Sequence, residues 1–190
     1  MKISKKNILI GIIVCIILFI IIASIYFYIN NKKTDKKLNN SNFYNDLTEY
    51  QSQYLLLQIN LIELNDNISI YWHDSIFKDK HNNDINQAIS DYKKDFESKI
   101  DETKDQYNKF VKIYKKIRTN ECENDECENI QSKSYKLKKA VTKYYDLIIF
   151  PSGNYNNFVD NSSDYYDESQ SEYDDLEDMS EDFFEKYVES

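Results

Sequence analysis

The chain is poor in the residues that make tight turns. It has only two glycines and one proline among 190 residues. Folds built from β-hairpins need many turns, and those turns depend heavily on these two residue types. The shortage therefore excludes a hairpin-rich β fold and predicts an all-α chain of long helices.

Recognisable catalytic and metal-binding motifs are also missing. The sequence has no glycine-rich phosphate loop, no nucleophile elbow and no Asp-x-Asn-x-Asp-Gly calcium loop. His73 could form half of an acid–base pair, but its place beside Trp72 and Asp74 is typical of a wet helix end. His81 and the cysteines match no zinc spacing. We predict no catalytic residue, no cofactor and no metal ligand.

Charge is segregated along the chain. Residues 160–190 hold thirteen Asp or Glu and one Lys, a balance of −12, whereas the whole chain carries −9, so residues 1–159 carry +3. A chain of this charge is a poor ligand for nucleic acid. The acidic segment from 160 is either a solvated face that lysine-rich helices attract or an interaction tail for a basic partner. Its continuing aromatic periodicity favours the first interpretation.

One long apolar run, residues 8–29, precedes the other segments. It contains no charged residue, and only Gly11, Cys15 and Ser24 interrupt its apolar character. As a helix it would be about 33 Å long, enough to cross a hydrocarbon core of about 30 Å. We therefore predict a transmembrane helix, preceded by a short basic tail (1–7) and followed by a polar stalk (30–42) that could continue the helix.

Two other interpretations of this run fit its residues less well. A cleaved secretory signal needs small residues before its cleavage site, and Ile21 fits that requirement poorly. A lipoprotein signal at Cys15 would have a smaller residue than Val14 before it. We therefore expect an uncleaved signal anchor. Positive charge is nearly balanced across the run, and a short amino-terminal tail is the easier end to leave inside, so we expect the rest of the chain outside the cytoplasm.

The clearest pattern beyond the stalk is a heptad repeat, called here the heptad seam. Its apolar side chains follow one another by alternating steps of four and three residues, which predicts a core helix with coiled-coil character. Ser41 could cap the start of this helix. The seam consists of Phe43, Leu47, Tyr50, Tyr54, Leu57, Leu61, Leu64, Ile68 and Tyr71.

Three further amphipathic segments follow the seam. A second helix is expected over 84–117, where an extra step of four between Phe96 and Ile100 would locally unwind a supercoil. A third is expected over about 130–148, ended by the breakers at 151–153. The last segment has a predicted apolar face made of Tyr155, Val159, Tyr166, Tyr173, Leu176, Phe183 and Tyr187.

These segments predict an elongated antiparallel bundle of three or four helices over residues 43–190. The loop between the second and third helices carries Cys122 and Cys127, which flank four polar residues. If the domain faces an oxidising exterior, a local disulfide between the two is expected. Two free thiols in a reducing cytoplasm are the alternative.

The chain resembles a recurring pattern in three short stretches. These are residues 71–77 (Tyr-Trp-His-Asp-Ser-Ile-Phe), 84–89 (Asp-Ile-Asn-Gln-Ala-Ile) and 151–155 (Pro-Ser-Gly-Asn-Tyr) with Phe158. The pattern is similar to small uncharacterised single-span membrane proteins of low-GC Gram-positive bacteria, over roughly residues 68–180. The resemblance implies a bacterial envelope location and brings no activity or site residue with it.

The expected function is that of a membrane-anchored helical interaction or structural protein of the cell envelope. Its expected partners are the membrane and either another envelope protein or a second copy of itself. Two alternatives stay open: an enzyme whose site is not visible in the sequence, and a module that binds an envelope lipid or polymer through exposed tyrosines.

Overall fold

The computed structural model describes residues 5–78, 80–81, 84–120 and 125–189, and up to residue 33 it describes only the side chains of residues 24, 26, 30 and 32. Every regular element among these residues is helical, which confirms the all-α prediction. The helices are α1 (Lys5–Phe77), α2 (Ile85–Asp95), α3 (Glu97–Thr119), α4 (Asp125–Ile149) and α5 (Tyr155–Phe184), followed by a π-helical turn (Glu185–Glu189).

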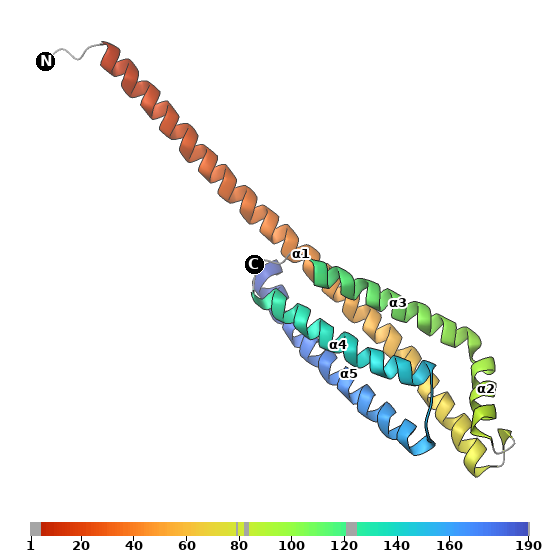
Figure 1. Cartoon of the computed structure of the whole chain (residues 1–190). Coiled ribbons are helices and arrows are strands. Elements are labelled where there is room, and N and C mark those ends of the chain that lie inside the picture. Colours follow the sequence, from red (N-terminus) through yellow and green to blue (C-terminus); the bar gives the residue numbers. More distant parts are fainter. Residues whose placement is uncertain (1–4, 79, 82–83, 121–124, 190) are drawn as a thin grey trace.

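Helix α1 runs the whole length of the molecule (Figure 1). Its first half projects alone, and its second half packs with α3, α4 and α5, which run alternately back and forth beside it. Contacts join α1 to α3, α3 to α4, α4 to α5 and α5 back to α1, which closes a four-helix bundle. The short helix α2 packs against the far end of α1 and leads into α3.

The heptad seam forms the centre of this bundle. Its first eight members, from Phe43 to Ile68, have no exposed surface. The ninth predicted member, Tyr71, is only partly buried, and its neighbour Trp72 takes the core position at this end of α1. Seam tyrosines reach two neighbours: Tyr50 stacks on Phe110 of α3 and Tyr54 stacks on Tyr173 of α5, each with ring centroids 4.6 Å apart.

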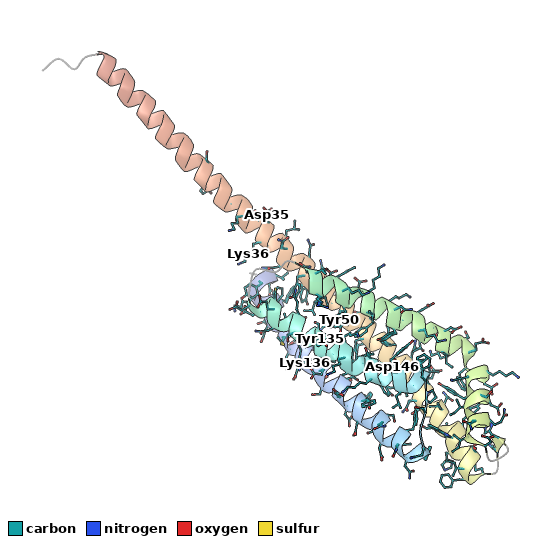
Figure 2. The ribbon with its side chains drawn as sticks, in the orientation of Figure 1. Asp35, Lys36, Tyr50, Tyr135, Lys136 and Asp146 are labelled. Atoms are coloured by element: carbon teal, nitrogen blue, oxygen red, sulfur yellow. The ribbon has the colours of Figure 1, made fainter. Side chains whose placement is uncertain are left out.

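The polar ends of these tyrosines also find partners. The Tyr50 hydroxyl donates a hydrogen bond of 2.9 Å to the backbone carbonyl of Ser134 on α4. Figure 2 shows Tyr50 within the bundle, while Asp35 and Lys36 lie on the projecting part of α1. The Tyr54 hydroxyl likewise reaches Gln170 on α5 (3.3 Å), so these two seam tyrosines are buried with their hydroxyl groups satisfied by other helices, whereas the buried Tyr92 hydroxyl has no such partner among the described residues.

Several predicted boundaries are corrected by the structure. Residues 30–42 continue α1 without interruption, as the stalk prediction allowed, but Ser41 consequently lies inside a helix and does not cap its start. The helix expected over 84–117 is divided at Phe96, whose backbone (φ −111°, ψ 19°) leaves the helical region. This break coincides with the predicted stutter. Helix α4 begins at Asp125, earlier than the expected Ile130, because the acidic residues of its first turn suit a helix start.

Two predicted helix boundaries are confirmed. The Asp84 side chain accepts hydrogen bonds from the backbone N–H groups of Asn86 (2.8 Å) and Gln87 (3.3 Å) at the start of α2. The stretch 151–153 separates α4 from α5, and Gly153 has a φ of +95°, which glycine adopts at little cost.

The apolar face predicted for α5 is partly wrong. Tyr173, Leu176 and Phe183 are buried as expected, but Val159 is exposed and its neighbour Phe158 takes the core position. Between these large residues, three serines face the bundle with almost no exposed surface: Ser162, Ser169 and Ser180. Small side chains at these positions leave room for α1 to lie close to α5.

Within the part of the chain that the structure describes, no helix is both long enough and apolar enough to cross a membrane. The backbone of residues 8–29 belongs to α1, whereas only Ser24 and Tyr26 of this run have described side chains. The predicted span therefore stays a prediction. The basic tail falls mainly on residues 1–4, which lie outside the described residues.

Candidate functional site

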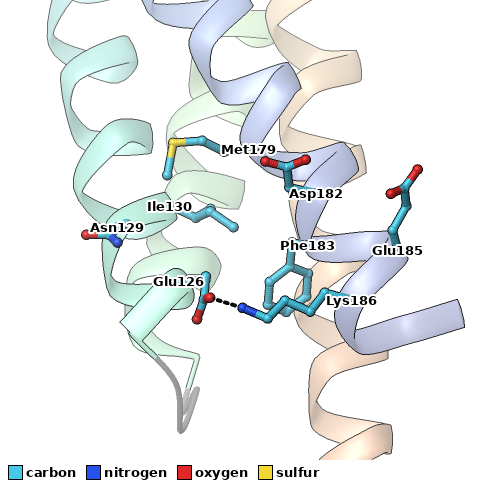
Figure 3. Close-up of a pocket in the computed structure, with 8 residues that line it drawn as sticks. All are labelled: Glu126, Asn129, Ile130, Met179, Asp182, Phe183, Glu185 and Lys186. Atoms are coloured by element: carbon cyan, nitrogen blue, oxygen red, sulfur yellow. Dashed lines mark hydrogen bonds and ion pairs between the residues drawn. The ribbon is translucent and has the colours of Figure 1, made fainter. Parts of the chain in front are cut away.

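A cavity of about 540 Å³ lies where the start of α4 meets the end of α5 (Figure 3). This end of the bundle is the one next to the projecting part of α1 (Figure 1). Residues from α4, from α5 and from the π-helical turn line the cavity. They are Glu126, Asn129, Ile130, Met179, Asp182, Phe183, Glu185 and Lys186.

The floor of the cavity is apolar and fixed by the core. Ile130 and Phe183 are each 1% exposed, and Met179 packs beside them. The Phe183 ring also contacts Phe43 of the heptad seam, with centroids 5.3 Å apart. The site is therefore built on residues that also hold α5 against α1, so its shape depends on the closure of the bundle.

The rim of the cavity is charged and mostly acidic. It carries three carboxylates, Glu126, Asp182 and Glu185, against one ammonium group, Lys186. Lys186 pairs with Glu126 across the mouth, as the dashed line in Figure 3 marks, and its ammonium lies 5.0 Å from the centre of the Tyr187 ring. The Lys186 pair lowers the pKa of Glu126 to about 2, and the same contact raises the pKa of Lys186.

This arrangement suits a group that is both apolar and positively charged. An alkyl or aromatic body could occupy the floor, and its cationic end could meet Asp182 or Glu185, or compete with Lys186 for Glu126. The protein's own lysine already places an ammonium at this mouth. The acidity of α5 is evident from the sequence, whereas this cavity is not, because its lining comes from segments about fifty residues apart.

Cys127 lies beside the cavity in the first turn of α4. Its side chain has no exposed surface, and its sulfur is disulfide-bonded. Cys122 lies outside the described residues. The predicted Cys122–Cys127 pairing therefore stays a prediction. Both cysteines fall in one tryptic peptide, and in the mature protein mass spectrometry of a non-reduced digest should find that peptide two hydrogens lighter than its reduced form.

His73 lies at the opposite end of the bundle, where α1 ends. Its Nδ1 is 3.4 Å from Asp74 Oδ1, but this carboxylate also pairs with Lys78 (2.9 Å) and Lys80 (2.7 Å). These cations hold the pKa of Asp74 far below its usual range. The Asp74 carbonyl accepts hydrogen bonds from the N–H groups of Lys78 and Lys80. Asp74 therefore organises the turn after α1, and His73 is not brought to the acidic cavity.

His81 has a structural partner of its own in the same region. Its Nδ1 lies 2.7 Å from Asp91 Oδ2, and its ring stacks on Tyr71 with centroids 5.1 Å apart. The Tyr71 hydroxyl in turn donates a 2.7 Å hydrogen bond to Asp95. Among the described residues, no three His, Cys, Asp or Glu side chains are placed to hold a metal ion.

The structure brings together stretches of the sequence pattern noted above. The Trp72 ring contacts Phe158 (5.0 Å between centroids) and Tyr155 (6.5 Å), which links the end of α1 to the start of α5. These ring contacts explain how α1 and α5 pack at this end of the bundle, and they assign no chemistry to it. Comparisons with models of protein families, with curated proteins and with solved structures find no significant match to this chain.

Proposed function

We propose that this chain is a membrane-anchored interaction protein of the cell envelope. Residues 8–29 would span the membrane as a signal anchor, and the bundle would lie outside the cytoplasm. The observation that carries this proposal is the continuity of α1: one helix of 73 residues includes both the apolar run and the heptad seam. A helix without a break transmits the position of the anchor directly to the bundle core.

The proposed function of the bundle is to bind another protein. Its anchor-side end offers the cavity between α4 and α5, with an apolar floor and three carboxylates on its rim. This chemistry fits a basic, partly apolar segment of another envelope protein. The enzyme alternative is less well supported, because His73 lies at the other end of the bundle and its neighbour Asp74 is occupied by lysines.

Alkaline washing of membranes tests the anchor. Lysine is strongly unfavourable at the centre of a transmembrane helix, by about 2.5–3.5 kcal/mol per residue. We expect the full chain to stay in carbonate-washed membranes and the double variant Ile16→Lys with Phe19→Lys to be released. The matched control is Asn45→Lys with Ser52→Lys, two exposed positions of the bundle, which should stay with the membrane. Release of the unaltered chain would contradict the anchor.

A further inference from the structure

Helix α1 carries a second apolar surface, on the side opposite the heptad seam. Five large apolar side chains face solvent there, called here the outer stripe, and Leu56 and Ile76 flank them with 48% and 41% exposure. The outer stripe consists of Leu55 (45% exposed), Ile59 (62%), Ile62 (36%), Ile70 (55%) and Phe77 (65%).

The outer stripe has the periodicity of a coiled coil with one stutter. Leu55, Ile59, Ile62 and Asp66 follow one another by steps of four, three and four residues. After one extra step of four, Ile70, His73 and Phe77 follow by steps of three and four. From Leu55 to Phe77 the stripe extends about 33 Å along the helix. Ile62 also borders a cavity lined by residues of α4 and α5, and the Phe77 ring lies 6.5 Å from the ring of Tyr155 on α5. The rest of the stripe, centred on Ile59, is left for a contact outside the bundle.

We propose that the outer stripe is the contact surface between two copies of this chain, packed with their α1 helices parallel. This inference rests on the proposed membrane anchor. Copies anchored in one membrane by the same residues of an unbroken helix present the outer stripe at the same height and in the same direction. A two-fold axis parallel to α1 then places Leu55 opposite Leu55 and Ile59 opposite Ile59, which is a self-complementary interface.

The size of the stripe fits a dimer that needs the membrane. Stable interfaces between soluble proteins bury about 800 Å² on each partner, whereas the largest apolar patches of monomers cover roughly 300–600 Å². Seven side chains that are each one third to two thirds exposed offer no more than the second range. Confinement of both copies to one bilayer raises their effective concentration and compensates for the small contact.

Asp66 sets the strength of this contact. It is exposed, and in a parallel pair it would face Asp66 of the other copy in the middle of the stripe. Two like charges at such a position oppose association, so the dimer is weaker than its apolar residues alone would make it. Replacement of Asp66 by leucine would therefore strengthen the dimer, an effect that a surface with no partner would not show.

Energy transfer between labelled copies in lipid vesicles tests the proposal. The full chain, labelled at its amino terminus with donor or acceptor, is reconstituted in phosphatidylcholine–phosphatidylglycerol vesicles over a range of protein-to-lipid ratios. We expect transfer above that of random mixing. Ile59→Glu should shift the half-maximal density upward by about tenfold or more, and Asp66→Leu should shift it downward. Tyr135→Glu, which alters an exposed aromatic residue of α4, is the matched control and should leave it unchanged.

Each result of this experiment decides between the proposals. Transfer no higher than random mixing, or equal transfer in the unaltered chain, Ile59→Glu and Asp66→Leu, overturns the dimer. Flotation of the vesicles reports the anchor separately. A chain that floats with the vesicles but stays monomeric contradicts only the dimer. A chain that does not float with them contradicts both the anchor and the dimer. Circular dichroism of each variant confirms that the helices are retained.

Discussion

Replacement of Leu61 by alanine should lower the free energy of unfolding by about 2–5 kcal/mol, a large part of the stability of a typical domain. Leu61 has no exposed surface and lies in the middle of the heptad seam. Removal of its side chain takes away buried apolar contacts and leaves a cavity that helices packed on several sides cannot fill.

Chemical denaturation of the chain without residues 1–29, followed by circular dichroism, measures this loss. The deletion removes no residue of the described core, which begins at Phe43 among the apolar side chains. Ile59→Ala is the matched control, because Ile59 is an aliphatic residue of the same helix with 62% exposure. Equal losses in the two variants would mean that the seam does not form the core.

Replacement of Ser169 by leucine should destabilise the chain by about 1–3 kcal/mol through overpacking. Ser169 has no exposed surface, and its Oγ accepts a hydrogen bond of 3.3 Å from Gln58 Nε2 on α1. A leucine there would lose this contact and push α5 away from α1. Because α5 completes the bundle, amide hydrogen exchange should increase first in α5.

Ser171→Leu provides the control for this experiment. Ser171 is exposed on the same helix, so the same substitution there adds bulk without a clash. The two variants are compared by denaturation and by hydrogen exchange of α5. If Ser169→Leu were as stable as Ser171→Leu, the close approach of α1 and α5 would be wrong.

Side-chain amides of α1, spaced one heptad apart, lie opposite serines of α5. Gln51 Oε1 accepts a 3.3 Å hydrogen bond from Ser180 Oγ, and Gln58 meets Ser169 one heptad later on α1. A further heptad along, Asn65 and Ser162 line one cavity of about 390 Å³. Polar pairs in a bundle can fix the register of two helices, because any shift leaves their groups without partners.

The features of the fold that depend on large apolar residues at regular spacing could be predicted from the sequence. The heptad seam on α1 was found because leucine, isoleucine and tyrosine carry most of the burial. The serine positions of α5 could not be found this way, since a serine has the same polarity whether it faces solvent or another helix. Val159 was therefore assigned to the buried face of α5 in error. The buried face at this position consists of Phe158 and Ser162.

The sequence-based prediction is wrong at two places where the local residues are compatible with either a helix end or a continuous helix. Ser41 is a good helix cap, but the helix that enters from the stalk continues through it. The stutter after Phe96 predicted a local change in supercoil, and the chain instead breaks into α2 and α3. The cavity between α4 and α5 could not be predicted, because it exists only once Glu126 and Lys186 are brought together by the fold.

Protease treatment of intact protoplasts tests most directly the claim that α1 carries an external bundle on a membrane anchor. We expect added protease to shorten the chain to a small membrane-bound stub that contains residues 8–29, while a cytoplasmic marker protein stays intact. A full-length chain that survives in intact protoplasts and is digested only after lysis would contradict the proposed orientation.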